Sequence, residues 1–140
     1  MNLTVNPILS AEERHNAIFN GDFIIQTDIK AVDKLLQHTR QLILTAFDGA
    51  PPETAQSLMP VEDFIAIVSK LKSTFTNHDI TTDIIREIIK ELSYNPNLTY
   101  FDVPRLRVVT SDNYLSSGVG YAYKAHRDTW YGSPEQQVNV

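Results

Sequence analysis

The chain has 140 residues, a net charge of −5 with neutral histidines, and no cysteine. This length predicts one domain with a hydrophobic core, and the mixture of 42% hydrophobic and 21% charged residues argues against global disorder. The acidic balance disfavours a nucleic-acid partner, and the lack of cysteine excludes disulfides and thiolate metal sites. The sequence has no apolar run near the roughly 20 residues of a transmembrane helix and no signal-peptide pattern in its first ten residues, so we expect a soluble, cytoplasmic protein without a membrane partner.

The first predicted element is a short helix. Ser10 and Glu13 have the spacing of a capping box, in which each side chain satisfies a backbone amide at the start of a helix. Asn20 and Gly21 tolerate positive φ and predict its end. Residues 23–25 are an apolar run typical of a strand, so we expect residues 21–26 to be extended and to be a candidate for a sheet.

Three further helices are predicted from apolar residues that recur at helical spacing in the ranges 29–47, 61–75 and 82–93. Thr27 or Asp28 is expected to cap the first of these helices. A loop is expected over residues 48–52, which contain glycine and two prolines. We interpret the apolar stripes as core packing, and the alternative is a partner-binding groove or a coiled coil.

The pattern changes after the turn at residues 94–97. Alternating or β-branched stretches predict antiparallel strands near 105–110, 119–126 and 137–140. The predicted fold class is therefore α+β, with a mainly helical front over residues 1–98 and a strand-rich part over 99–140, in a single domain over 1–140. Because the last residues begin a strand with nothing to pair it, we expect this domain to be the N-terminal part of a larger one.

Candidate chemistry lies at His126 and Asp128. Side chains two positions apart in an extended segment point the same way, so these two can converge on one point. An imidazole and a carboxylate are two of the three ligands of the usual mononuclear non-haem iron site. Four histidines and ten aspartates in this chain give about 0.3 such pairs by chance, and the alternative is a surface histidine beside a solvated aspartate. The strand-like segment before the pair and the aromatic residues around it favour the metal site.

Four segments together resemble a known family: Pro104–Val109 (PRLRVV), Gly118–Tyr121 (GVGY), His126–Tyr131 (HRDTWY) and Gln137–Asn139 (QVN). They are similar to the iron(II)/2-oxoglutarate-dependent oxygenases, in particular the phytanoyl-CoA-hydroxylase-like branch, over about residues 99–140. The resemblance implies a double-stranded β-helix (jelly-roll), of which these residues would form the first strands. It also implies His126 and Asp128 as the first two Fe(II) ligands. The implied activity is hydroxylation of a small-molecule substrate, with conversion of 2-oxoglutarate and O₂ to succinate and CO₂.

The sequence departs from this family in one respect. The family has a second ligand histidine on a later strand, followed by a basic residue that holds 2-oxoglutarate. No histidine follows His126, and the only later basic residue is Arg127. We therefore expect the chain alone to be inactive, as a fragment that lacks the C-terminal part of its domain, as one of two partner chains, or as a degenerate relative. His15, His38 and His78 lie on predicted helices and are interpreted as surface or capping residues.

Two amides complete the set of candidate site residues. Gln137 and Asn139 share one face of the last predicted strand and could contact the cosubstrate or the substrate, or could simply be the polar face of a sheet. The alternative function for the whole chain is a non-catalytic binding or interaction module that keeps part of the barrel and uses its helical face.

Overall fold

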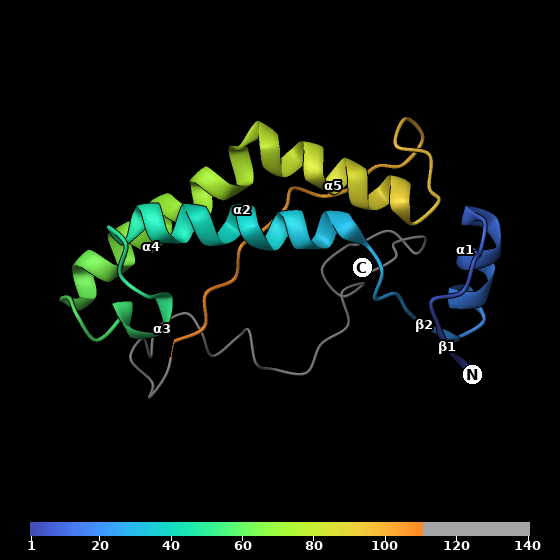
Figure 1. Cartoon of the computed structure of the whole chain (residues 1–140), viewed down its shortest axis with the longest axis horizontal. Helices are drawn as coiled ribbons and strands as arrows, with labels where there is room; N and C mark the ends of the chain where they lie inside the picture. Colours follow the sequence, from blue (N-terminus) through green and yellow to red (C-terminus); the bar gives the residue numbers. More distant parts are fainter. Residues whose placement is uncertain (111–140) are drawn as a thin grey trace. The chain divides into compact units, whose positions relative to one another are not determined.

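A computed structural model of the chain describes residues 1–110. The chain divides into two compact units, Met1–Val108 and Val109–Val140, and nearly all described residues belong to the first. The elements of the first unit are, in chain order, β1 (Leu3–Val5), α1 (Ala11–Phe19), β2 (Phe23–Ile25), α2 (Lys30–Ala46), α3 (Pro52–Ala55), α4 (Val61–Asn77) and α5 (Asp79–Glu91) (Figure 1).

Helix α1 begins and ends as its sequence predicts. The Ser10 hydroxyl accepts a hydrogen bond from the Glu13 amide at 3.2 Å, and the Glu13 carboxylate accepts one from the Ser10 amide at 2.8 Å. Past the helix end, Gly21 has a φ of +83° and its amide donates to the carbonyl of Ile18 at 2.9 Å. The capping box and the glycine stop are therefore confirmed.

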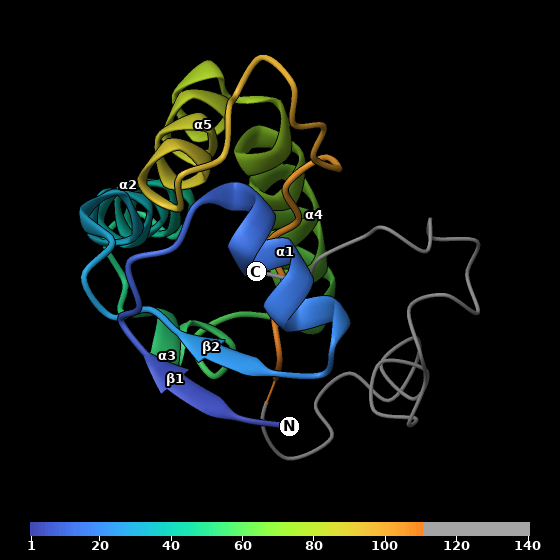
Figure 2. The same cartoon turned by 90° about the vertical axis from the view of Figure 1, so that its right-hand side faces the viewer.

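The two strands form a small parallel sheet, shown side by side in Figure 2. The predicted strand at Phe23–Ile25 is confirmed as β2, and its partner β1 was not predicted because three residues are too short to show a period. Leu3 pairs with Phe23 and Val5 with Ile25. Helix α1 connects the strands, as a parallel pair requires a crossover rather than a tight turn.

The predicted cap of α2 is wrong. Neither Thr27 nor Asp28 caps the helix; Ile29 occupies the N-cap position and has no capping side chain. The carboxylate of Glu91 at the end of α5 accepts hydrogen bonds from the first two amides of α2, at 2.7 Å (Lys30) and 3.2 Å (Ala31). The Glu91 carboxylate of the neighbouring helix thus takes the place of a local capping side chain. It satisfies the same backbone amides, which have no partner within α2.

Helix α5 begins three residues earlier than predicted, at Asp79, because His78 caps it. The Nδ1 atom of His78 accepts a hydrogen bond from the Ile80 amide at 3.3 Å. His78 is also the last flanking residue of α4, so one residue separates two helices. The predicted loop over residues 48–52 leads into the single turn of α3, which begins at Pro52, a residue suited to the first helical position.

The core lies where α2, α4 and α5 pack together, and Figure 1 shows α2 running alongside α5. The interpretation of the apolar stripes as core packing is confirmed for most of their residues, although Val32, Leu36 and Ile65 remain exposed. The buried apolar side chains of these helices and their ends are Ala31, Phe47, Phe64, Val68, Leu71, Phe75, Ile84, Ile88, Ile89 and Leu92.

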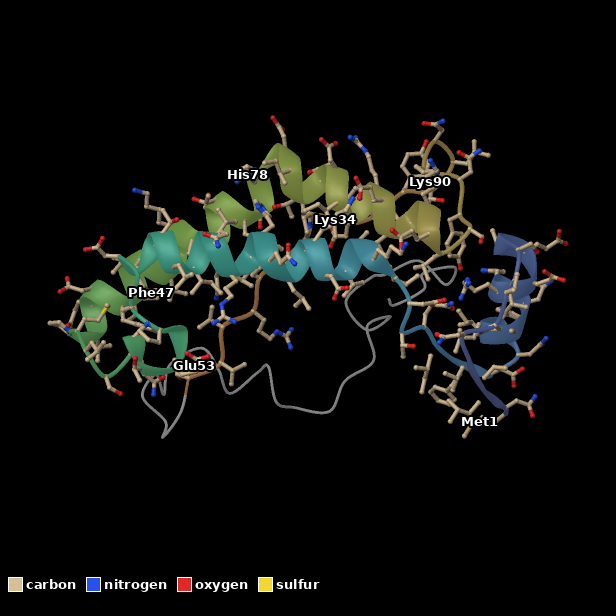
Figure 3. All side chains as sticks on the ribbon, in the orientation of Figure 1. Met1, Lys34, Phe47, Glu53, His78 and Lys90 are labelled. Carbon is tan, nitrogen blue, oxygen red and sulfur yellow. The ribbon has the colours of Figure 1, made fainter. Side chains whose placement is uncertain are left out.

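Three polar contacts join α2 to α5, and on α2 they recur once per helical turn. Glu91 meets the α2 amide of Lys30, Glu87 pairs with Lys34, and Thr81 meets His38. The α2 residues ascend while their α5 partners descend along the chain, so the two helices are antiparallel. Figure 3 shows Lys34 on the side of α2 that faces α5. The first half of α2, from Lys30 to His38, is thus joined to α5 by polar contacts.

The strand predicted near 105–110 is not formed. Residues 101–110 contain neither helix nor strand, and the Thr76 hydroxyl holds this segment to α4 by donating to the carbonyl of Pro104 at 2.8 Å. A strand needs a hydrogen-bonded neighbour, and the strands predicted at 119–126 and 137–140 lie outside the described residues. The jelly-roll therefore remains a prediction. Among the helices of residues 1–110, none has the length and apolar content needed to cross a membrane.

Candidate functional site

The four site residues predicted from the sequence lie outside the described residues. His126 and Asp128 as metal ligands, and Gln137 and Asn139 as cosubstrate or substrate contacts, therefore remain predictions. Within residues 1–110, no three histidine, aspartate or glutamate side chains form a group that could hold a metal ion. The described part of the chain therefore adds no metal centre to the predicted one.

Two histidines meet where α2 passes the junction of α4 and α5. The ring centroids of His38 and His78 are 4.9 Å apart, with an angle of 72° between the ring planes, so the edge of one ring meets the face of the other. Figure 3 shows His78 at the junction of the two helices. The Nε2 atom of His38 also lies 3.0 Å from the hydroxyl of Thr81, whose residue is 0% exposed. We call His38, His78 and Thr81 the histidine junction.

The local sequence explains this arrangement. Thr81 lies one turn before Ile84 on the buried face of α5, so the apolar stripe of α5 ends in a hydroxyl. His38 lies one turn after Leu35, which packs against the same core. The sequence therefore indicated that both His38 and Thr81 face the core. Their contact could not be predicted, because it depends on the antiparallel register of α2 and α5, which no local pattern reveals.

The pKa of His38 is lowered below its usual range, first because burial penalises the charged ring and second because His78 lies close by. His38 is therefore neutral at neutral pH, with one ring nitrogen able to accept a hydrogen bond. The interpretation of His78 as a capping residue is confirmed. His15 stacks on Phe19 with ring centroids 6.3 Å apart, and neither it nor His38 belongs to a described metal-binding group.

A shallow hollow of ≈ 640 Å³ lies beside the histidine junction on the outer face of α4. Its lining residues are Ala66, Ser69, Lys70, Ser73, Thr74, Asn77 and His78. The hollow is wide open to solvent, so its hydroxyls and its ammonium group stay hydrated and gain little of the strength that a buried site gives. Its lining resembles an ordinary exposed helix surface. It does not pair an acidic side chain with a basic one, as general acid–base catalysis would require.

A buried cation lies at the other end of α5. Arg14 of α1 is 5% exposed, and its Nε donates to the carbonyl of Leu92 at 3.1 Å while Nη1 donates to the Gln26 side chain at 3.2 Å. The hydroxyl of Tyr94 is buried nearby, without a hydrogen-bond partner among the described residues. Burial raises the pKa of Tyr94, and the charge of Arg14 opposes that effect. Arg14 thus caps the end of α5 and joins it to α1 and to Gln26, the residue that follows β2.

Comparisons of the chain with protein-family models, curated proteins and solved structures found no match.

Proposed function

We propose that this chain supplies two iron ligands to an Fe(II)/2-oxoglutarate-dependent oxygenase that hydroxylates a small-molecule substrate. The observation that carries the proposal is the sequence around His126 and Asp128, a His-x-Asp pair between a strand-like segment and aromatic residues. The three other segments that resemble this family support it. We place the protein in the cytoplasm, in keeping with a chain that has no cysteine.

The donor chemistry fits ferrous iron. A neutral imidazole favours a transition metal over magnesium, and a carboxylate reduces the net charge of the site. When bound, Fe(II) and 2-oxoglutarate supply the oxidation, in which O₂ and 2-oxoglutarate are converted to succinate, CO₂ and a hydroxyl group on the substrate. His126 and Asp128 would hold and orient the metal. Gln137 and Asn139 would form hydrogen bonds to 2-oxoglutarate or to the substrate.

The proposed site needs two groups that residues 128–140 do not contain, namely a second histidine ligand and a basic residue for the cosubstrate carboxylate. We propose that further polypeptide of the same domain supplies both. The assay is a Mn(II) or Fe(II) titration, with 2-oxoglutarate present, of the protein as it occurs in the cell.

His126→Ala and Asp128→Ala should each weaken metal binding by more than the roughly 10–100-fold that loss of a ligand's hydrogen-bond partner costs. His15→Ala removes the same kind of side chain from α1 and is the matched control, which should bind metal as the parent does. Parent-like metal binding by both His126→Ala and Asp128→Ala would identify the pair as a chance match. The function would then be the non-catalytic interaction module.

A further inference from the structure

We propose that the histidine junction is a proton-sensitive latch, which holds α2 to the start of α5 while His38 and His78 are neutral and releases it when they take up protons. This inference is independent of the proposed oxygenase function. It rests on three contacts of the described residues, each of which depends on the protonation of an imidazole.

The first contact is between the two rings. Neutral imidazoles can pack edge to face, as His38 and His78 do at 4.9 Å between centroids. Two imidazolium rings at this distance repel each other, and the repulsion is poorly screened because His38 is half-buried between helices. Proton uptake therefore opposes the packing of α2 against the α4–α5 junction.

The second contact is the hydrogen bond between His38 and Thr81. With its proton on Nδ1, the neutral ring accepts from the Thr81 hydroxyl at Nε2, over 3.0 Å. The charged ring has donors at both nitrogens, so the hydroxyl must turn and its own proton needs a new acceptor. Thr81 is 0% exposed, which keeps bulk water from supplying that acceptor.

The third contact is the cap of α5. His78 accepts the Ile80 amide at Nδ1, and this is open only to a ring whose Nδ1 carries no proton. Protonation removes the acceptor and places a positive charge at the start of a helix, where the helix dipole disfavours it. The first turn of α5 is then left without its cap, and this turn carries Thr81.

The charged groups around His38 do not offset these effects. His78, from the junction of α4 and α5, is the one titratable neighbour that acts on the charge of His38 in the described part of the chain. On the same face, one turn away along α2, Lys34 is paired with Glu87 of α5, so this pair adds little net charge. No described carboxylate is hydrogen-bonded or paired to either ring to stabilise an imidazolium.

The sign of the effect follows from the lowered pKa of His38. A base whose pKa is lower in the folded state stabilises the fold above its unfolded pKa, and this stabilisation is lost as the pH falls through the folded pKa. The latch therefore opens on mild acidification. Because Ile84 lies one turn below Thr81 in the core, opening exposes apolar surface at this end of the helices.

The experiment is a pH titration of the full chain by NMR, from about pH 8 to 5, the range in which histidines change charge. The ring signals of His38, His78 and His15 are followed together with the hydrogen-exchange protection of the first amides of α5. We expect the pKa of His38 to lie below the ordinary histidine value of 6.5, and the protection of these amides to fall in parallel with the titration of His38. Titration of His38 at or above 6.5 would overturn the proposal without the need for any variant.

Two matched variants test the cause of the opening. His38→Gln keeps a hydrogen-bonding side chain opposite Thr81 but cannot be charged, so the pH-dependent part of the protection loss should shrink to what the His78 cap alone contributes. His15→Gln removes a histidine outside the junction and should keep the parent's pH dependence. Undiminished pH dependence in His38→Gln would show that another group controls the opening and would overturn the latch.

Discussion

Among single changes of charged residues in residues 1–108, Arg14→Ala should cause the largest loss of stability. The guanidinium donates hydrogen bonds to the Leu92 carbonyl at 3.1 Å and to the side-chain oxygen of Gln26 at 3.2 Å, and the residue is 5% exposed. A hydrogen bond to a charged group contributes about 1.5–3 kcal/mol, and a buried acceptor left without a partner costs about 1–3 kcal/mol. These contributions overlap, so we expect a loss of about 2–4 kcal/mol, a large part of the roughly 5–15 kcal/mol that holds a domain folded.

The assay is urea unfolding of the full chain, with the free energy of unfolding compared among variants. Arg86→Ala is the matched control, because Arg86 pairs with Asp83 on the surface of α5 and both side chains are more than half exposed. Such a pair contributes about 0.2–1 kcal/mol. Arg14→Lys keeps the charge but not the planar guanidinium that reaches two acceptors. Its loss of stability should therefore lie between the losses of Arg14→Ala and Arg86→Ala. If Arg14→Ala lost no more stability than Arg86→Ala, the bridge between α1 and the end of α5 would not be a major contributor to stability.

Three further predictions concern helix ends and the core. Glu91→Ala should cost about 0.5–2 kcal/mol in urea unfolding and lower the hydrogen-exchange protection of the first two amides of α2, and unchanged protection would refute the cap. Leu71→Ala in the core should cost about 2–5 kcal/mol, whereas the same deletion at the exposed Leu36 should change stability by less than about 0.5 kcal/mol; similar losses would contradict the position of the core. The amide and hydroxyl of Ser10 lower the pKa of Glu13, so this contact stabilises α1 above the ordinary pKa of 4.5 and is lost as the pH falls through the lowered value. Ser10→Ala should move the NMR titration midpoint of Glu13 toward 4.5, and an unmoved midpoint would show that the hydroxyl does not contribute.

The features that could be predicted from the sequence are those encoded within one or two turns. The capping box at Ser10, the stop at Gly21 and the stripe of α4 need only neighbouring residues, and each is found where the sequence placed it. The cap of α2 could not be predicted, because the acceptor is Glu91, sixty residues along the chain from Ala31. In the same way, β1 is a strand only because β2 lies beside it.

The same difference between local and long-range contacts separates the two candidate sites. The His126 and Asp128 pair can be proposed from sequence alone because its residues share one short segment. The histidine junction could not, because it joins side chains forty-three positions apart (His38 and Thr81) through the packing of two helices. Helical periodicity indicated that both positions face inward, but periodicity alone does not specify which residue of one helix meets which residue of another.

The three polar contacts between α2 and α5 also fix how far one helix can slide along the other. Apolar side chains alone tolerate a shift by one turn, about 5.4 Å, because a stripe of similar residues looks much the same after each turn. Here such a shift would at once separate Glu91 from the α2 amides, Glu87 from Lys34, and Thr81 from His38. The polar contacts therefore favour a single alignment of the two helices, while burial of the apolar core contributes most of the stability of their packing.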